Sequence, residues 1–384
     1  MVLKRIFYFL LAISFFNFHS CQLKPNKSEI ESVFESIPDS LLISKVKYAK
    51  GFDLYELDKI RKLVLYQPEL RENIIATFYI ADSLTLSNYY TESENLIVVN
   101  QDNVAVFSAT QLNAFERLDL LDKVKGISEA KYIISKTIKH KLEKKEIVEL
   151  ATNADLFIEK VITVNPSLIF YSPYRFTNPH PLDAAGIPLI PFYDYFENEP
   201  LGRAEWIKFT AVFFDYDDLA DSLFNYIEEQ YIGYKTLTDD TLIRPTVFSD
   251  KYFNGQWYVP GGQSYIAALF KDAGADYLWK DDIHSSSFPL DYEVVYSKAY
   301  NADFWRIVGS YGDEPSYEAL GSENGLYTNF MAFKDKNVIW CDARKTAYFE
   351  KSPLEPHLVL ADLIFAFHPE LLPAHKPQYY HILK

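Results

Sequence analysis

The sequence predicts an α/β protein of two similar lobes, each with a mostly parallel sheet, joined by one long rigid helix. Three observations lead to this prediction. Short apolar strands alternate with helical stretches between Val104 and Ile190. A helical pattern then runs without interruption from Glu205 to about Tyr234. After it the strand–loop–helix plan repeats, and Val106-Phe107-Ser108 recurs as Val247-Phe248-Ser249.

The chain begins with the pattern of an export signal. Two basic residues precede an apolar run, Ile6 to Phe16, which is too short to cross a bilayer. Cys21 stands directly after the expected cleavage site, and its thiol and new amino terminus are groups that a cell can acylate. A chain acylated there is held at a membrane face by lipid while its body stays in water. The alternative is an ordinary secretion signal followed by an unmodified cysteine.

Composition limits the class of protein. The formal net charge is −15 and no basic stripe occurs, so nucleic acid is excluded as an expected partner. Hydrophobic residues make up 48% of the 384 residues, enough for a sizeable core. The only cysteines are Cys21 and Cys341, so a lipidated Cys21 leaves no disulfide and the fold must rest on its core. The surplus of Tyr and Phe fits either a concave binding surface or an aromatic core.

The segment before the first lobe is polar and Ser-rich over residues 22–40, which predicts a tether. Short β-like runs follow at Ser44–Tyr48, Lys62–Tyr66, Ile75–Ile80 and Leu96–Asn100.

From Val104 onward the elements alternate. The expected order is a strand at Val104–Phe107, helices at Gln111–Leu121 and Ala154–Val164, a strand at Leu168–Tyr171 and a last strand at Gly186–Ile190. This alternation is typical of a parallel sheet covered on both faces.

The helical stretch from Glu205 to Tyr234 carries no proline, and its apolar residues recur at helical spacing. A helix of that length would span about 45 Å, which suits a strut between two lobes. The predicted domains are a signal peptide (1–20), a lipid-anchored tether (21–43), an amino-terminal α/β lobe (44–203), the connecting helix (204–236) and a carboxy-terminal α/β lobe (237–384).

The sequence lacks the motifs that are typical of enzyme active sites and of metal sites. The closest approach to a nucleophile elbow, Gly262-Gln263-Ser264-Tyr265-Ile266, lacks its last glycine and is better interpreted as a helix start after a glycine turn. No two histidines have metal-ligand spacing. We therefore expect no catalysis, no cofactor and no direct metal site.

Loops rich in aromatic residues and arginine remain as candidate binding elements. Tyr174 and Arg175 follow one expected strand, Trp257 and Tyr258 hold the matching place in the second half, and Arg344 follows the strand Asn337–Cys341. Ligands of open α/β sheets bind at the carboxyl ends of strands, where Arg offers a fork for anions and Tyr or Trp a flat apolar face. The alternative is that Trp257 and Tyr174 fill the core and that the arginines lie on the surface. The predicted ligand-binding residues are Ser108, Tyr174, Arg175, Arg203, Trp257, Tyr258 and Arg344.

Four stretches resemble one known family. They are Val106–Ser128, Glu159–Phe170 (with Ser167 where the family usually has Asp), Pro200–Lys208 and Leu358–Pro373. Together they resemble substrate-binding proteins of ABC importers for iron complexes and cobalamin, which have the helical-backbone periplasmic-binding-protein fold. Pro200–Lys208 looks like the start of the spine helix in members from Bacteroidetes-like bacteria.

The resemblance implies a function without bond-making. The cargo would be a ferric siderophore or haem, with cobalamin as the alternative, and the partners would be the permease and ATPase subunits of an importer. Glu159 and Glu293 match the family's one surface glutamate per lobe that docks on the permease. The location implied is the periplasm, anchored by lipid at Cys21. A free metal-ion receptor and a cell-envelope hydrolase using Ser264 or Glu199 remain as less favoured alternatives.

Overall fold

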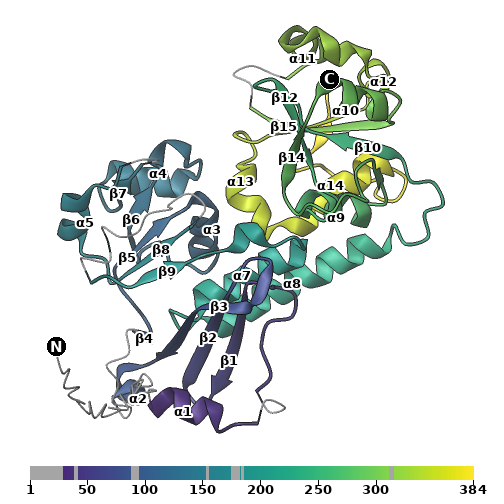
Figure 1. Ribbon diagram of the computed structural model, residues 1–384. Coiled ribbons are helices and arrows are strands. Elements are labelled where there is room, and N and C mark those ends of the chain that lie inside the picture. Colours follow the sequence, from purple (N-terminus) through teal and green to yellow (C-terminus); the bar gives the residue numbers. More distant parts are fainter. Residues whose placement is uncertain are drawn as a thin grey trace, which may run out of the picture.

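The computed structural model describes residues 29–38, 42–87, 95–152, 155–173, 182, 186–310 and 315–384. Two five-stranded sheets form the two lobes, and α7 and α8 join them (Figure 1). An additional four-stranded sheet lies under these two helices. The predicted fold class, two α/β lobes with mostly parallel sheets and a helical connection, is confirmed.

The first lobe has a fully parallel sheet in the order β7-β6-β5-β8-β9. Its elements are β5 (Val104–Phe107), α3 (Ala109–Arg117), β6 (Val124–Ser128), the 3-10 helix η2 (Ala130–Tyr132), α4 (Lys136–Glu143), β7 (Val148–Ala151), α5 (Ile158–Val164), β8 (Leu168–Tyr171) and β9 (Leu189–Pro191). All four residues of β5 are buried, as expected for a central parallel strand. One face of the sheet joins the main core, and the other packs against α5 through Val161 and Ile169.

The second lobe has the strand order β13-β10-β15-β16-β17, in which only the last pair is antiparallel. Its elements are β10 (Thr246–Ser249), α9 (Tyr265–Asp272), β13 (Asp276–Tyr277), α10 (Tyr292–Ala299), β15 (Phe304–Gly309), α11 (Tyr317–Glu323), η4 (Gly325–Asn329), α12 (Met331–Lys334), β16 (Val338–Asp342), α13 (Tyr348–Lys351), η5 (Ser352–Leu354), α14 (Pro356–Phe367) and β17 (His381–Ile382). A small antiparallel sheet consists of β11 (Tyr252–Phe253), β12 (Gln256–Pro260) and β14 (Ser287–Leu290).

The connection between the lobes is helical, but it is not one straight helix. After η3 (Asp194–Phe196), α7 (Pro200–Ala211) and α8 (Asp217–Thr236) are separated by a turn in which Asp215 has a φ of 61°. α8 folds back along α7, because Lys208 Nζ lies 3.2 Å from Asp221 Oδ1 and 4.8 Å from the ring centroid of Phe224. The single helix expected from Glu205 to Tyr234 is therefore corrected to a helical hairpin.

The turn has a packing reason. Phe213 and Phe214 are both buried in it, 5.2 Å from the ring of Phe170 and 5.5 Å from the ring of Phe115, respectively. Both rings also contact the same partner in the first lobe, since the rings of Phe213 and Phe214 lie 5.2 and 6.4 Å from that of Phe170. The turn lets both of them pack into the first lobe.

Residues 44–100 form a sheet of their own and do not extend the sheet of the first lobe. Its strands are β1 (Phe52–Leu57), β2 (Ile60–Gln67), β3 (Leu70–Ala81) and β4 (Leu96–Val98), in the order β1-β2-β3-β4. Two short helices accompany it, α1 (Glu29–Glu35) before the sheet and α2 (Ser83–Leu86) between β3 and β4. Ser44–Tyr48, expected as a strand, is not one. The N–H groups of Lys47 and Tyr48 donate to the carboxylate of Glu205 on α7, at 2.9 and 2.7 Å, and not to a neighbouring strand.

One hydrophobic core runs through the molecule. It includes Phe52 of the amino-terminal sheet, Phe209 of α7, Phe115 of the first lobe and Leu363 of the second. None of the helices formed by the described residues combines the length and the apolar character that a membrane-spanning helix needs.

Candidate functional site: the region between the lobes

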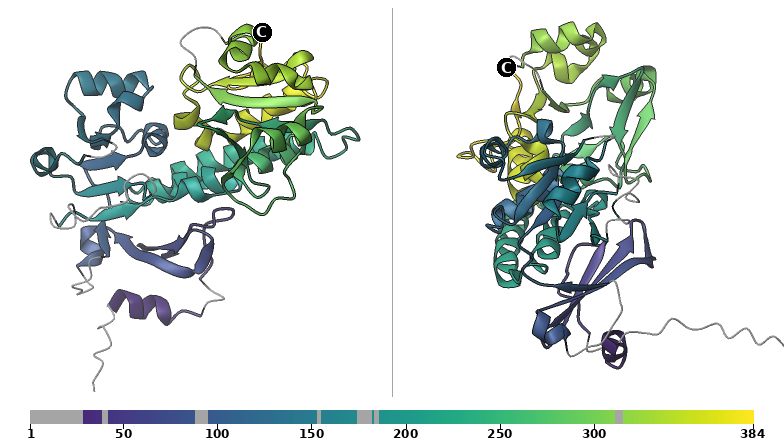
Figure 2. Two further views of the ribbon diagram at one scale, coloured as in Figure 1. Left: turned by 45° about the horizontal axis from the view of Figure 1, so that its top comes forward. Right: turned by 90° about the vertical axis from the view of Figure 1, so that its left-hand side faces the viewer.

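The carboxyl ends of the parallel strands mark the candidate site. In the first lobe Ser108 follows β5 and Glu129 follows β6, and in the second lobe Asp250 follows β10 and Ala343 follows β16. The two lobes lie next to each other above α7 and α8 (Figure 2, left). Ligands of open α/β sheets bind at the carboxyl ends of strands. The region between the lobes is therefore the candidate site.

Three side chains, those of Glu350, Asn113 and Arg117, make polar contacts between the second lobe and the first. The carboxylate of Glu350 accepts hydrogen bonds from the N–H groups of Ile134 and Ser135, the latter at 3.1 Å. Asn113 Nδ2 donates to the Lys351 carbonyl at 3.3 Å, and Arg117 forms an ion pair with Glu355. Burial raises the pKa of the Glu350 carboxyl above its usual value. The lobes are thus joined through a partly desolvated carboxylate.

A cavity of about 440 Å³ lies beside these contacts and is lined by both lobes. Its cationic side chains are those of Arg117, Lys136, Lys345 and Lys351, and its carboxylates are those of Glu116 and Glu355. The excess of positive charge suits a ligand with anionic oxygen atoms, because guanidinium and ammonium groups donate charge-assisted hydrogen bonds to them. None of the described residues predicted to bind ligand lines this cavity, although Arg344 directly precedes Lys345.

Ser108 and Arg344 lie at strand ends, as expected. Ser108 is mostly buried at the start of α3, and its Oγ lies 2.8 Å from Thr110 Oγ1. The Arg344 side chain is exposed after β16, while its backbone N–H donates to Asp342 Oδ1 at 3.1 Å. The exposed guanidinium is available to a ligand.

Arg203 lies on α7 where the two lobes and the connection meet. Its Nε is 3.2 Å from Asp194 Oδ2, and its guanidinium lies 5.5 Å from the ring centroid of Tyr265 on α9. Burial raises the pKa of the Asp194 carboxyl even with Arg203 beside it. The buried Tyr265 hydroxyl has no hydrogen-bond partner among the described residues. Arg203 is therefore largely committed to an internal ion pair.

Trp257 and Tyr258 point in opposite directions from β12. Trp257 is fully buried, its indole N–H donates to the Ser249 carbonyl at 2.9 Å, and its ring packs 5.6 Å from that of Phe330. Tyr258 is 41% exposed. The structure therefore corrects the expected placement of Trp257, which offers no surface to a ligand and fills the core as in the alternative interpretation. Tyr258 keeps an open face.

Three predicted residues, Tyr174, Arg175 and Cys21, lie outside the described residues. The two predicted docking residues are described. Glu159 is exposed in the first turn of α5, and Glu293 is exposed in the first turn of α10. They belong to different lobes, one each, and a carboxylate is favoured in the first turn of a helix by the helix dipole.

Sequence reasoning missed Arg306. This arginine is 4% exposed in β15, and its guanidinium donates to Asp250 Oδ1 at 3.1 Å, Ser249 Oγ at 3.2 Å and Tyr380 Oη at 2.9 Å. Burial raises the pKa of the Asp250 carboxyl. The network fixes the start of the loop after β10 within the second lobe. The sequence did contain a signal for this network: Arg306 stands inside an apolar strand, and a buried arginine needs hydrogen-bonding partners.

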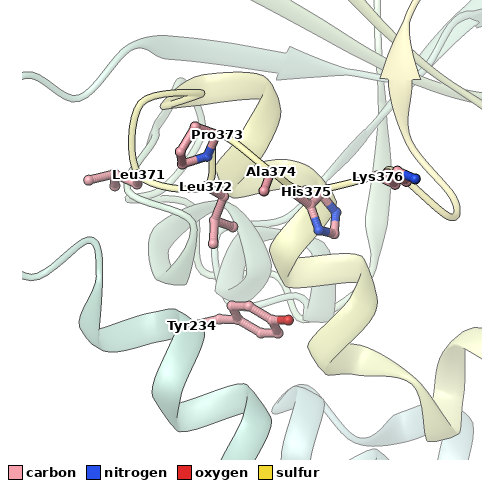
Figure 3. A pocket seen from close by; sticks show the side chains of 7 residues that line it. All are labelled: Tyr234, Leu371, Leu372, Pro373, Ala374, His375 and Lys376. Atoms are coloured by element: carbon pink, nitrogen blue, oxygen red, sulfur yellow. The ribbon is translucent and has the colours of Figure 1, made fainter.

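A second cavity, of about 480 Å³, lies on the second lobe away from the region between the lobes. It is lined by Tyr234 of α8 and residues 371–376 (Figure 3). His375 Nε2 lies 2.6 Å from Asp362 Oδ1, so this imidazole is engaged in holding the carboxy-terminal segment. Within the described part of the chain, no three His, Cys, Asp or Glu residues gather in a way that could hold a metal ion.

Known proteins resemble this chain in sequence. Residues 104–345 match the family described as periplasmic binding protein. An uncharacterized lipoprotein of Methanocaldococcus jannaschii is 27% identical over 300 residues, covering 75% of this chain and 70% of the relative. Because this relative is archaeal, the expected link to Bacteroidetes-like bacteria is corrected: the likeness is not specific to them.

Solved structures resemble it in fold. A TroA-like periplasmic binding protein, FepB, from Veillonella parvula has a TM-score of 0.56 at 19% identity, covering 74% of this chain and 95% of its own. The periplasmic haem-binding protein RhuT from Roseiflexus has a TM-score of 0.52 at 17% identity, covering 71% and 100%. A protein of an Fe3+-hydroxamate transport system from Saccharomonospora viridis has a TM-score of 0.55 at 14% identity, covering 70% and 94%. With the family match extending over more than half of its length, the chain belongs to the periplasmic binding protein family.

Proposed function

We propose that the protein is the solute-binding component of an ABC importer and captures a small iron complex, a ferric siderophore or haem, between its lobes. The observation that carries this proposal is the cavity lined by both lobes, which includes Lys345, three residues after the end of β16. The iron ligands in the names of two proteins of similar fold, haem and Fe3+-hydroxamate, support the class of cargo.

The charge around the cavity supports an anionic cargo. Four cationic side chains line it against two carboxylates, in a protein whose net charge is −15. Ferric complexes and haem carry oxygen-rich anionic groups that an arginine fork or an ammonium group can bind.

The proposed contacts to the cargo come from both lobes. Arg344 and Tyr258 have exposed side chains in the second lobe. Ser108, Tyr174 and Arg175 would contribute from the first lobe. Arg203 would act indirectly, because its ion pair with Asp194 holds the part of α7 that lies between the lobes. Trp257 would act only by supporting β12 from the core.

Glu159 and Glu293 are the proposed docking residues for the permease subunits, which work with the ATPase subunits of the importer. Both carboxylates are exposed, one on each lobe. Exposed charges at an interface rim chiefly set orientation and association rate. The proposal therefore assigns them to delivery of the cargo and not to its capture.

Lipid attachment at Cys21 is the proposed means of keeping the protein near its importer in the periplasm. The sequence pattern before Cys21 and the lipoprotein name of the archaeal relative support this assignment.

Cobalamin is the alternative cargo, because the sequence also resembles the substrate-binding proteins of cobalamin importers. A free metal-ion receptor and an envelope hydrolase are less favoured. Ser264, the candidate nucleophile, is mostly buried, and its Oγ accepts the Ala267 N–H at 3.2 Å as the cap of α9. This geometry supports a structural role for the hydroxyl.

A thermal-shift panel tests the proposal. Purified protein is heated with ferric hydroxamate and ferric catecholate siderophores, haem, cobalamin, zinc and manganese. A bound ligand at 100 times its Kd stabilises the folded protein by about 2.7 kcal/mol. We expect an iron complex to raise the Tm. A shift with cobalamin alone or with a free ion alone would replace the proposed cargo, and no shift with any ligand would contradict the function.

Arg344→Ala should weaken binding of the shifting iron complex by about tenfold or more, since it removes one charge-assisted contact. Arg244→Ala is the matched control, because Arg244 precedes the opposite end of β10 and donates to the Lys271 carbonyl. Calorimetric titration of both variants measures the effect. Equal affinities would remove Arg344 from the site.

A further inference from the structure

The amino-terminal sheet, β1 to β4, lies outside residues 104–345, the part of the chain that matches the family. It nevertheless contacts three parts of the molecule that would move relative to each other if the lobes moved. These parts are α7, α8 and the second lobe.

The contact with α7 is made by a buried carboxylate. Glu205 is 0% exposed and accepts hydrogen bonds from the N–H groups of Lys47, Tyr48 and Ala49, at 2.9, 2.7 and 3.0 Å. Separating this segment, which leads into β1, from α7 would take away these three donors and leave the buried carboxylate with only Lys208 Nζ, 3.2 Å away, which is costly. Phe52 adds a ring contact of 4.9 Å to Trp206 of α7.

The same segment also holds α8. The Tyr48 hydroxyl and Lys47 Nζ both donate to the carboxylate of Glu228 on α8. Arg61 of β2 forms ion pairs with Asp215 in the turn between the helices and with Asp217 Oδ2, at 3.0 Å, at the start of α8. The sheet therefore binds both helices of the hairpin and the turn that joins them.

The sheet also reaches the second lobe. Ser285 Oγ donates to the carboxylate of Glu69, which lies in the turn between β2 and β3. In Figure 2, right, this end of the sheet extends toward the second lobe.

We propose that the amino-terminal sheet is a brace that locks α7 to α8 and to the second lobe, so that the lobes keep one separation with or without cargo. Phe213, in the turn directly after α7, is packed in the first lobe against Phe170. Tyr231 of α8 is bonded to Asp272 of the second lobe at 2.7 Å. A change in lobe separation would therefore change the angle between the helices, and the sheet resists that change by binding both.

Amide hydrogen exchange in the protein without cargo tests the brace. The N–H groups of Ile134 and Ser135 are bonded across the lobes to Glu350, so they exchange when the lobes separate. The variant Arg61→Ala with Ser285→Ala removes brace contacts far from these amides. We expect it to speed exchange of the peptide containing Ile134 and Ser135 by about fivefold or more.

The matched control is Arg71→Ala with Ser286→Ala. Arg71 forms its ion pair with Asp53 inside the same sheet, at 2.7 Å, and donates to the Lys50 carbonyl at 2.9 Å, so the control loses a comparable pair but no side-chain contact to α7 or α8. Tyr48→Phe, which removes only the hydroxyl bonded to Glu228, is a milder second test and should also speed exchange. Unchanged exchange in both brace variants, or an equal increase in the control, would overturn the proposal. Because no ligand is used, this outcome would leave the proposed function untouched.

Discussion

At the scale of single residues, two adjacent aromatic side chains differ in what they do: Trp257 fills the core, and Tyr258 faces the surface. Trp257 and Tyr258 alternate on β12, so one side chain enters the core and the other faces outward. Both look alike in sequence, as aromatic residues in a loop-flanked run before two glycines. Only the strand register decides which one can meet a ligand, and that register comes from pairing with β14.

Replacing Trp257 with Ala should destabilise the fold by about 3–5 kcal/mol, because it empties a fully buried site and leaves the Ser249 carbonyl without its indole donor. Tyr258→Ala should change stability by within about 0.5 kcal/mol. Denaturant unfolding of the two variants gives the comparison. Equal losses of stability would show that the two faces of β12 are misassigned.

His357 makes stability depend on pH. Burial, followed by the nearby charge of Arg117, lowers the pKa of this imidazole to about 4. The unfolded chain takes up the proton near pH 6.5, so stability is full above that pH and falls as pH drops toward about 4. His357→Gln should flatten the decline of Tm over this window. His140→Gln, at an exposed histidine of α4, should not, and a flattening in both would contradict the assignment.

At the scale of elements, the sequence predicted strands better than the connection. The observed β5, β8 and β16 each lie within about a residue of the expected strands, because buried parallel strands are continuous apolar runs. The turn between α7 and α8 was missed, since Phe213 and Phe214 continue the helical pattern and the turn is set by packing against Phe170. Three strands of the amino-terminal sheet were expected, but not that they form a sheet separate from the first lobe and bound to α7. Its anchor, Glu205, looks like an ordinary helix carboxylate in sequence.

The close contact between the amino-terminal sheet and α7 predicts opposite effects for two glycine substitutions. A Cβ at Gly51 would lie 2.7 Å from Trp206 Cζ2, so Gly51→Ala should destabilise by about 1–3 kcal/mol. Gly233 of α8 has open space around it, and Gly233→Ala should stabilise by about 0.5–1 kcal/mol through helix propensity. Thermal unfolding measures both. A neutral Gly51→Ala would argue against tight packing of the sheet on α7.

At the scale of the whole molecule, capture and delivery of cargo are assigned to different surfaces. The cavity lies between the lobes, while Glu159 and Glu293 lie exposed at the starts of α5 and α10. The two-lobe plan was predictable because the strand–helix pattern repeats in both halves. The arrangement of the cavity was not predictable, because its lining residues are mostly polar and are scattered along the sequence, from Asn113 to Glu355.

Because the two surfaces are separate, the double variant Glu159→Lys with Glu293→Lys should bind cargo normally. It should support uptake about tenfold less well, since the charges that orient docking are reversed. Cellular uptake of labelled cargo and calorimetric binding provide the two readouts. Glu143→Lys with Glu318→Lys, at exposed helical positions of the two lobes, is the control. Loss of binding in the docking variant, or normal uptake, would contradict the assignment.

Isothermal titration of the purified protein with a ferric hydroxamate siderophore, haem and cobalamin is the most direct test of solute capture between the lobes. The account predicts saturable binding of an iron complex, one molecule per chain, with a Kd below about 1 μM. Arg344→Ala should weaken that binding. Absence of saturable binding to every ligand of the series would contradict the account.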